Sequence, residues 1–300
     1  MIIKKIIILG SNGQLGQSLK HNLRYENIEA YSRTECDISN LNNLLEKIGN
    51  VKNSIIINAA AYTNVEGAEV ERELALNINS TALQNISSIC HKGNNILFHF
   101  STDYVFNGRS LKAYNEEDQI SPINYYGETK ALGEEYIQSI IKKFYIFRTS
   151  WVYGEHGQNF PSKIIELLKS EKNLKIVNDQ ISVPTSTDFL TQCTGAAIDK
   201  ILIDDAMDFG IYNLVPDGSC SKYELAKEIN NFFKSNQIKD FHESSIDGVA
   251  SSFFSTKAKR PIFSALDNSK FRDKSGFHIK NWQVYLTVFL ENYLKKISFK

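Results

Sequence analysis

The sequence has no excess of charge of either sign. Lys and Arg together number 34, and Asp and Glu also number 34, so the formal net charge is zero. Because a chain without a basic field has no long-range attraction for phosphates, we expect no nucleic-acid partner. Long apolar runs are also missing, since none approaches the roughly 20 residues that a membrane-spanning helix needs. We therefore expect no membrane partner.

Cysteine and histidine are few and scattered. The cysteines lie far apart without any C-x-x-C pair, at Cys36, Cys90, Cys193 and Cys220. This pattern argues against a disulfide framework and a structural zinc site, and it predicts a cytoplasmic location. The histidines show no metal-ligand spacing, so no metal is assigned. His99, in the apolar stretch ILFHFS, is interpreted as a core or strand-end residue.

The composition itself is that of an ordinary globular protein. The chain has 300 residues, of which 42% are hydrophobic and 23% charged, enough for one large α/β domain or two modest ones. Near the N-terminus, the apolar run Ile6–Leu9 follows two lysines and stops at Gly10. The run is too short for the apolar region of a signal peptide, and it predicts a buried first strand instead.

Apolar runs alternate with helical patterns through the first half of the chain. Strands are predicted at residues 4–10, 28–32, 54–60, 95–101 and 144–150. Helices are predicted at residues 14–24, 40–48 and 71–92, followed by one that contains Tyr126 and Lys130. Nearly continuous apolar strands separated by helices are typical of a parallel sheet covered on both faces. The predicted fold class is therefore α/β, with a Rossmann-like doubly wound parallel sheet.

The alternation loosens beyond residue 150, which predicts a smaller mixed α/β domain for the substrate. Helices are expected at 159–169, 187–202, 221–235 and 281–296, a strand at 211–215, and loops over 242–268. The helix at 221–235 opens with Ser221 and Glu224, a capping-box pattern. We predict a dinucleotide-binding domain of residues 1–150 and about 176–206. The substrate-binding domain would comprise about 151–175 and 207–300.

A glycine-rich turn follows the first strand. Gly10, Gly13 and Gly16 are spaced G-x-x-G-x-x-G at a strand-to-helix junction, with Asn12 inside the turn. Glycines at such a junction let the backbone approach a pyrophosphate, which then lies at the helix N-terminus. The turn therefore predicts a dinucleotide cofactor.

The end of the second strand bears on which dinucleotide is used. An acidic residue there would bind the adenosine ribose hydroxyls and repel a 2′-phosphate. This chain has Ser32 and Arg33 at that point and no acid until Glu35. A hydroxyl and a guanidinium suit a 2′-phosphate, so NADPH is favoured and NADH stays open. Alternatively, Arg33 is a solvated turn residue.

Two tyrosines open the helix in SPINYYGETKALGEE, residues 121–135. The second, Tyr126, shares a helix face with Lys130, and a neighbouring ammonium would lower the pKa of the phenol. Thr102 ends the fourth strand, so its hydroxyl would reach the same crevice at the carboxyl edge of the sheet. With Thr102 holding a carbonyl oxygen, hydride from a nicotinamide and a proton from Tyr126 would reduce that carbonyl. Taken alone, the Tyr126–Lys130 spacing also fits surface packing.

Five segments resemble the extended short-chain dehydrogenase/reductases, and more narrowly the dTDP-4-dehydrorhamnose reductase family. They are residues 10–16, 58–63 (NAAAYT), 101–106 (STDYVF), 126–130 (YGETK) and 148–154 (RTSWVYG). Asp179-Gln180, Pro184-Thr185 and Arg260-Pro261 extend the match, which covers nearly the whole chain. The resemblance implies reduction of the 4-keto group of dTDP-6-deoxy-L-lyxo-4-hexulose to dTDP-L-rhamnose, with NAD(P)H as the reductant.

The resemblance also implies roles for individual residues. The catalytic trio would be Thr102, Tyr126 and Lys130. Besides the glycine turn, the cofactor would be lined by Gln14, Leu15, Asp37, Ile38, Ala59, Ala60 and Ala61. The dTDP-4-keto-6-deoxy sugar would contact Thr63, Val65, Asp103, Tyr104 and Trp151. From the residues alone, Asp37 could instead cap a helix, and the two aromatic residues could belong to the core.

Two positions depart from the family pattern. Glu66-Gly67 stands where the family often has Asp-Lys, which could alter substrate contacts, and Ser182 stands at a usual glycine. Some family members are described with magnesium at a dimer interface formed by acidic residues, and no counterparts of these acids are assigned in this sequence. A homodimer therefore stays open, and no metal is assigned. Arg260-Pro261 suits either a diphosphate contact or a simple turn.

Three other functions are alternatives to this reduction. A dehydratase of this fold needs a second carboxylate after Asp103, where this chain has Tyr104. A 4-epimerase uses the same Thr, Tyr and Lys chemistry but keeps NAD bound between half-reactions. A non-catalytic regulatory subunit of the methionine adenosyltransferase type has no need for all three catalytic residues. The configuration of the product at C4, rhamnose or talose series, stays open.

Overall fold

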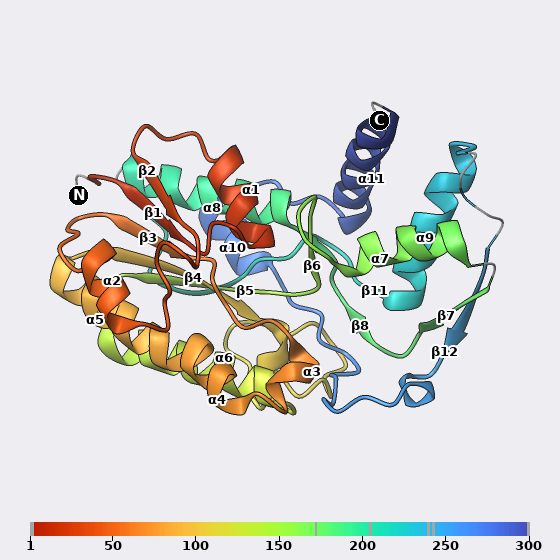
Figure 1. Cartoon of the computed structure of the whole chain (residues 1–300), viewed down its shortest axis with the longest axis horizontal. Helices are drawn as coiled ribbons and strands as arrows, with labels where there is room; N and C mark the ends of the chain where they lie inside the picture. The colour runs from red at the N-terminus through yellow and green to blue at the C-terminus, as the bar shows by residue number, and fades with distance from the viewer. Residues whose placement is uncertain (1–2, 172, 204–205, 239–240, 242–243, 299–300) are drawn as a thin grey trace.

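The computed structural model describes residues 3–171, 173–203, 206–238, 241 and 244–298. Figure 1 shows a central sheet between layers of helices, with a smaller lobe beside one edge of these layers. The sheet has six parallel strands in the order β10-β5-β4-β3-β1-β2. In chain order they are β1 (Ile6–Leu9), β2 (Ile28–Tyr31), β3 (Ile55–Asn58), β4 (Ile96–Thr102), β5 (Phe144–Thr149) and β10 (Gly210–Asn213). The predicted α/β class and doubly wound parallel sheet are confirmed.

The alternation of side chains along the first strand explains the layers. Ile6 and Ile8 belong to the core on one face of the sheet, and Ile7 and Leu9 belong to the core on the other. All four are almost completely buried, as expected for a strand covered on both sides. The first face is covered by α1 (Gln14–Asn22), α8 (Thr187–Leu202) and α10 (Ser269–Ser275). The second is covered by α2 (Leu41–Ile48), α5 (Ala82–Gly93) and α6 (Tyr125–Ile140).

The helix predicted over residues 71–92 contains an irregular turn. It consists of α4 (Arg72–Leu76), a π-helical segment (Asn77–Thr81) and α5. Asn79 in the π segment donates to Thr129 Oγ1 of α6 at 3.1 Å and to the Tyr62 carbonyl at 3.0 Å. The wider turn therefore ties the loop after β3 to the helix that carries Tyr126. A short helix in that loop, α3 (Val65–Ala68), was not predicted.

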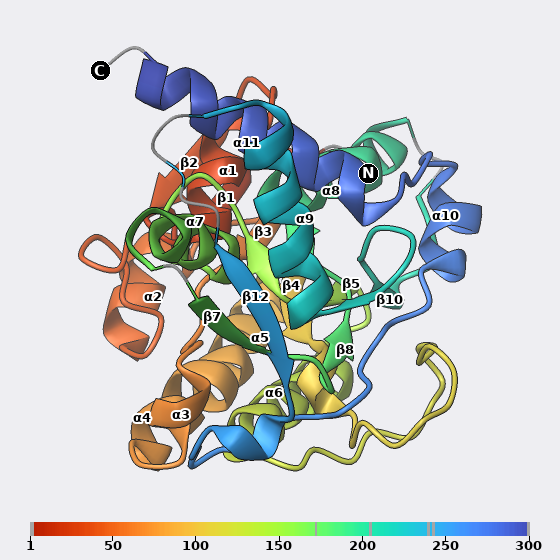
Figure 2. The same ribbon diagram turned by 90° about the vertical axis from the view of Figure 1, so that its right-hand side faces the viewer.

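The smaller lobe has a separate apolar core formed by α7 (Phe160–Ser170), α9 (Lys222–Ser235) and α11 (Trp282–Ser298). The predicted capping box at the start of α9 is confirmed, since the Ser221 hydroxyl accepts from the Glu224 amide and the Glu224 carboxylate accepts from the Ser221 amide. Figure 2 shows β7 (Asn173–Val177) beside β12 (Ser245–Val249), which pair in parallel. The prediction of loops over 242–268 was therefore wrong for β12, while residues 242–243 lie outside the described part.

Short strand pairs connect the lobe to the sheet. β6 (Val152–Tyr153) pairs with β9 (Thr185–Ser186), and β8 (Ile181–Ser182) pairs with β11 (Cys220–Ser221). The division into two domains stays a prediction, although β10 pairs with β5 and so lies in the large sheet despite the proposed boundary at residue 207.

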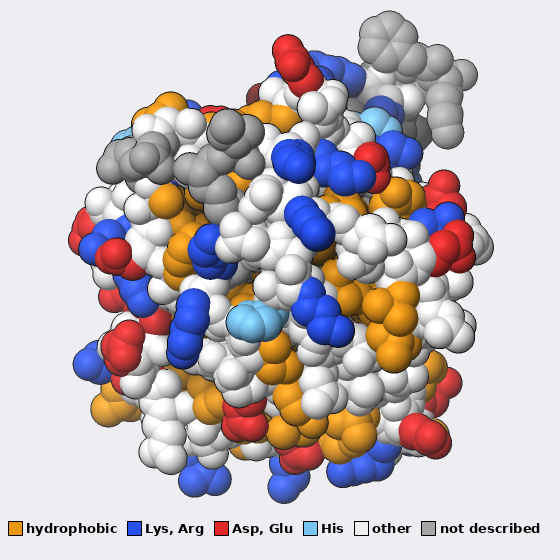
Figure 3. All heavy atoms as spheres, turned by 90° about the vertical axis from the view of Figure 1, so that its left-hand side faces the viewer, with side chains coloured by type: hydrophobic (Ala, Val, Ile, Leu, Met, Phe, Trp, Pro, Cys, Tyr) orange, Lys and Arg blue, Asp and Glu red, His pale blue; other side chains and the backbone are white. Residues whose placement is uncertain are grey.

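No helix in the described part of the chain is long and apolar enough to cross a bilayer. Both signs of charge are present on the face drawn in Figure 3.

Candidate active site

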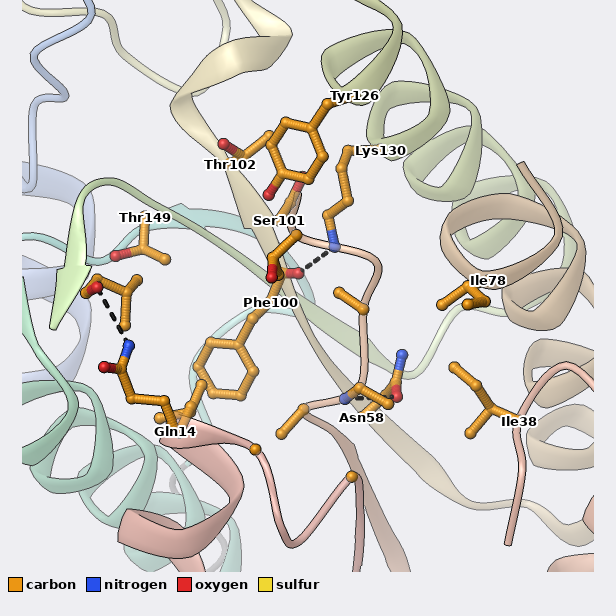
Figure 4. A pocket seen from close by; sticks show the side chains of 18 of the residues that line it. Gln14, Ile38, Asn58, Ile78, Phe100, Ser101, Thr102, Tyr126, Lys130 and Thr149 are labelled. Atoms are coloured by element: carbon orange, nitrogen blue, oxygen red, sulfur yellow. Dashed lines mark hydrogen bonds between the residues drawn. The ribbon is translucent and has the colours of Figure 1, made fainter. Parts of the chain in front are cut away.

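A cavity of about 590 Å³ opens where β1, β3, β4 and β5 end. This is the carboxyl edge of the parallel sheet, where ligands bind in open α/β folds. Figure 4 shows side chains from several of these strand ends pointing into it. The sequence-predicted residues that line it are Gly10, Asn12, Gly13, Gln14, Leu15, Arg33, Asp37, Ile38, Ala59, Ala60, Ala61, Thr63, Val65, Thr102, Asp103, Tyr104, Tyr126, Lys130 and Trp151. Gly16 and Ser32 do not line it.

The glycine turn at one end of the cavity requires its glycines. Gly10 has φ +83°, and a Cβ there would lie 2.8 Å from the Cα of Ala60. A Cβ on Gly16 would lie 2.1 Å from the Gly10 carbonyl oxygen, so this glycine lets α1 pack on the turn. Gly13 precedes α1 and contributes no capping side chain. The first amides of α1 are therefore available for an anion such as a pyrophosphate.

The two residues predicted to recognise a 2′-phosphate lie differently. The Ser32 hydroxyl donates to Glu35 Oε2 at 2.7 Å, and the Ser32 amide donates to the same oxygen. Ser32 is thus occupied within its own turn. Arg33 lines the cavity with its side chain 72% exposed, and its Nε lies 3.5 Å from Asp37 Oδ2. Asp37 lines the cavity and accepts from the Ser39 amide and hydroxyl. The alternative that Asp37 caps a helix was wrong, because Asn40 is the N-cap of α2.

Helix α6 presents the predicted acid and its lysine from one face. The Asn124 side chain caps the helix by accepting from the Gly127 amide at 2.8 Å. Gly127 has no room for a Cβ, which would lie 2.2 Å from the Tyr104 carbonyl oxygen. This close approach places Tyr126 against the end of β4, where Thr102 lies. In Figure 4 the Tyr126 hydroxyl and the Lys130 amine project toward the same part of the cavity.

The expected lowering of the Tyr126 pKa is not found. Burial of the phenol raises the pKa of Tyr126 to about 12, and the Asp103 charge adds to this rise. The Thr102 hydroxyl opposes the rise. Lys130 is not among the groups that shift it. The prediction that Lys130 lowers the Tyr126 pKa, made from their helical spacing, was therefore wrong. Sharing a helix face brings the two residues close together, but desolvation of the phenolate, and not the nearby cation, determines the direction of the shift in the Tyr126 pKa.

Lys130 is itself strongly affected by its surroundings. The residue is 1% exposed, and its Nζ donates to the Phe100 carbonyl at 2.6 Å. The same Nζ lies 3.2 Å from Nε2 of His99, another buried residue of β4. Burial lowers the pKa of Lys130 to about 8, although the Glu134 carboxylate opposes this change. Lys130 therefore changes between its ammonium and amine forms close to neutral pH.

Asp103 is held by three hydroxyl groups. Its Oδ2 accepts from Ser264 at 2.5 Å and from Ser182 at 3.1 Å, and its Oδ1 accepts from Thr102 at 3.2 Å. Burial raises the pKa of Asp103 to about 6, and the bonds from these hydroxyls oppose the rise. Ser182, which replaces a usual glycine of the family, thus contributes to the cluster. The Asp103 carboxylate positions Thr102 as well as lining the cavity.

The other position that departs from the family pattern, Glu66, follows the cavity residue Val65 and makes an ion pair with Arg260. Glu66 Oε1 lies 2.7 Å from Arg260 Nη2, and its Oε2 accepts from the Lys257 and Ala258 amides. The charge of Arg260 also acts on Tyr104, where it opposes the rise in the phenol pKa that burial causes. The guanidinium expected to suit a diphosphate is therefore anchored beside a cavity residue. A diphosphate at this position would share the guanidinium with Glu66.

Trp151 begins the segment that leads from β5 into the smaller lobe. It has φ +39°, an uncommon backbone conformation for a bulky residue and one that surrounding contacts must impose. The Lys222 ammonium lies 5.5 Å from its ring centroid and 5.9 Å from that of Phe160. Burial lowers the pKa of Lys222 to about 8, with a further contribution from Arg260. Lys222 was not predicted from the sequence.

Sequence reasoning also missed several lining residues. These are Cys36, Asn58, Ile78, Phe100, Ser101, Thr149, Ser150, Val152 and Gln158. The position of Asn58 and Thr149 at strand ends could have identified them, because ligands bind at that edge of the sheet. Within the described residues, no three His, Cys, Asp or Glu side chains gather in a way that could hold a metal ion.

Comparisons with known proteins agree with this geometry. The family model described as the RmlD substrate binding domain matches residues 4–295. A dTDP-4-dehydrorhamnose reductase of Escherichia coli K12 is 34% identical over 93% of this chain and 94% of its own length. The Bacillus subtilis spore coat polysaccharide biosynthesis protein SpsK is 31% identical, covering 96% and 97%. The crystal structure of dTDP-4-dehydrorhamnose reductase from Bacillus anthracis in complex with NADP has a TM-score of 0.87 and 32% identity, covering 97% and 100%.

Proposed function

This chain belongs to the family of the RmlD substrate binding domain, and on that premise we propose that it reduces a dTDP-4-keto-6-deoxy-hexulose to dTDP-L-rhamnose with NADPH. One observation carries the proposal. Thr102, Tyr126 and Lys130 line the same cavity as the glycine turn at residues 10–16. A proton donor and a site for a hydride-donating dinucleotide are thereby brought together.

The residues present fit a dinucleotide. The turn around Gly10 leaves no room for a Cβ, and the N-terminus of α1 has no capping side chain. Both features favour the close approach of a pyrophosphate. When bound, the nicotinamide supplies hydride to the carbonyl carbon of the sugar. Lys130 would donate to the nicotinamide ribose, because its amine is held at the end of β4 by the Phe100 carbonyl.

The proton is the part of the reaction that this chain provides directly. Tyr126 holds its proton firmly at neutral pH, since its pKa is raised to about 12. It therefore acts as a general acid toward the oxygen at C4, whose negative charge develops as hydride arrives. Thr102 donates its single hydroxyl proton to Asp103 Oδ1 in the structure, and on substrate binding it would turn this proton to the oxygen at C4 and hold that oxygen in line with the phenol. The proposed substrate contacts are Thr63, Val65, Asp103, Tyr104 and Trp151.

Arg33 should determine the preference for NADPH. A guanidinium–phosphate contact contributes ~1.5–3 kcal/mol net, which corresponds to roughly 10–150-fold in kcat/KM. We expect the unmodified protein to prefer NADPH by that factor, and Arg33→Ala to lose most of the preference with little change in the NADH reaction. Initial rates with both cofactors at varied concentration would measure this.

Arg24→Ala is a suitable control, because Arg24 is an exposed arginine beyond α1 and does not line the cavity. The control should keep the preference of the unmodified protein. Equal kcat/KM values for NADPH and NADH before any substitution would show that Arg33 remains paired with Asp37 and does not bind a phosphate.

Lys130→Met should weaken NADPH binding by roughly 10–150-fold, because a charged hydrogen-bond donor is lost. The pH dependence should change as well. Lys130 is an ammonium below its pKa of about 8, so NADPH affinity of the unmodified protein should fall as pH rises through that value. The variant should lack this decline. NADPH dissociation constants across the pH range would test both claims, and an unchanged decline in the variant would assign it to another group.

The proposed function is tested with the purified protein, NADPH and the 4-keto sugar nucleotide. We expect NADPH oxidation that depends on the sugar, and NMR of the product should identify L-rhamnose. A 6-deoxytalose product would keep the reaction type and correct the configuration. Protein that purifies with NAD bound and interconverts sugar nucleotides without net oxidation would be an epimerase instead.

The cellular location and assembly are proposed on a coarser basis. The four cysteines are buried free thiols, which supports the proposed cytoplasmic location. A homodimer remains a proposal from the family resemblance alone. Gel filtration with light scattering would measure the assembly directly.

A further inference from the structure

His99 is a buried histidine to which the proposed mechanism assigns no role. It lies in β4 opposite Asn58 of β3 and is 1% exposed. Its Nδ1 is 3.2 Å from Asn58 Nδ2, and its Nε2 is 3.2 Å from Lys130 Nζ. Both ring nitrogens therefore face nitrogen atoms, and the position of the ring proton decides the nature of each contact.

The contacts of Asn58 determine that position. Asn58 Oδ1 accepts from the Ala60 amide at 3.2 Å, so the Asn58 NH₂ group must face His99. An NH₂ group only donates, and His99 Nδ1 must therefore accept. Burial, together with the Lys130 charge, holds the pKa of His99 well below its ordinary value, so the ring is neutral. A neutral imidazole has one N–H, and here it lies on Nε2.

The Nε2–H group faces Lys130. A neutral amine has a lone pair that can accept this proton, whereas an ammonium has none. The Phe100 carbonyl, at 2.6 Å, accepts from Lys130 in either state. The contact with His99 therefore stabilises the amine form alone, and it is unfavourable for the ammonium form.

We propose that His99 is a positioning residue that controls when Lys130 carries its proton, because Asn58 keeps the imidazole in the tautomer that donates to the amine. Among the described residues, Glu134, one turn later on the same helix, is the ionisable group whose charge acts on Lys130, and Tyr126 lies one turn earlier. Glu134 favours the ammonium, so His99 and Glu134 act in opposite directions. Burial brings the pKa of Lys130 down to about 8, and the contact with His99 acts in the same direction as burial.

The consequence for the cofactor rests on the proposed function. If Lys130 donates to the nicotinamide ribose, His99 and Asn58 set the pH at which that cation is lost. His99, which does not line the cavity, and Asn58, which lines it at the end of β3, would then determine the upper pH limit for NADPH binding. The tautomer and the lysine pKa can be measured without NADPH or turnover, so failure of this inference is distinguishable from failure of the proposed function.

The tautomer is tested by ¹⁵N NMR of the full-length protein labelled at histidine. We expect the His99 signals to show a neutral ring with its proton on Nε2 throughout the titration of Lys130. The signals are assigned by their loss in His99→Gln, and the buried ring is also recognised by its lack of titration. A proton on Nδ1 would overturn the proposal, because Nε2 would then accept from the ammonium.

The effect on Lys130 is tested by NMR titration of lysine labelled at the ε carbon. In His99→Gln the amide oxygen can accept from the ammonium, so the pKa of Lys130 should rise by about 1–2 pH units. Asn58→Asp should act in the same direction, since a carboxylate accepts from Nδ1–H and moves the bare nitrogen to Nε2. His21→Gln, at an exposed histidine, is the matched control and should leave the pKa unchanged.

A purely structural role for His99 would lower the melting temperature of these variants without moving the titration of Lys130. The same lysine pKa in the unmodified protein and in both folded variants would therefore overturn the proposal. If neither variant folds, the ¹⁵N measurement on the unmodified protein decides the question by itself.

Discussion

Replacing Tyr126 with phenylalanine should lower turnover by ~10²–10⁴-fold, the usual contribution of a positioned general acid. The substitution removes one oxygen atom and leaves the ring, which packs edge-to-face against Tyr104 with centroids 6.0 Å apart. The cavity should therefore keep its shape, and NADPH affinity should change little. Single-turnover rates of NADPH oxidation with saturating sugar nucleotide would isolate the chemical step.

Tyr125 provides a matched control one residue away. Its ring lies under the Arg72 guanidinium at 3.6 Å, and it does not line the cavity. Tyr125→Phe should keep near-normal turnover, because the two side chains leave the helix in different directions. Near-normal turnover in Tyr126→Phe would refute the assignment of Tyr126. Equal losses in both variants would point to damage at the start of α6.

The parts of the site that follow from local sequence were predictable. The glycine turn, the strands of the central sheet and the pairing of Tyr126 with Lys130 on one helix face depend on neighbours within a few residues. Their patterns are therefore visible without a structure. The six-stranded sheet then brings strand ends to one edge, which is why most of the proposed residues share a cavity.

The parts that depend on distant partners were not predictable. Asp103 receives hydroxyls from Ser182 and Ser264, which are 79 and 161 residues away. No local pattern links these positions. Burial caused a second failure: helical spacing gave the proximity of Lys130 to Tyr126 but not the desolvation that raises the phenol pKa. His99 likewise has an interpretable role only once its partners are known.

Breaking the buried ion pair between α6 and β5 should have a large effect on stability. Glu134 of α6 is completely buried, and Arg148 of β5 is 3% exposed. Arg148 Nη2 donates to Glu134 Oε2 at 2.7 Å, and Nε donates to the same carboxylate. Glu134→Ala would leave a buried guanidinium without its counter-charge, which costs about 3–5 kcal/mol. That loss is a large part of the ~5–15 kcal/mol that stabilises a typical domain.

Urea unfolding of the variants would measure the cost, and the exposed pair of Lys5 and Glu29 gives the comparison. Their side chains are 31% and 42% exposed, so Glu29→Ala should cost no more than about 1 kcal/mol. Replacing Glu134 and Arg148 together with apolar residues of similar volume should restore much of the stability, because no charge is then left buried. A cost for Glu134→Ala as small as that for Glu29→Ala would contradict this account.

Because the Glu134 charge also favours the ammonium of Lys130, a folded Glu134→Gln variant should lose NADPH affinity at a lower pH than the unmodified protein. The pair would thus both support the helix and set the charge of the residue that binds the cofactor.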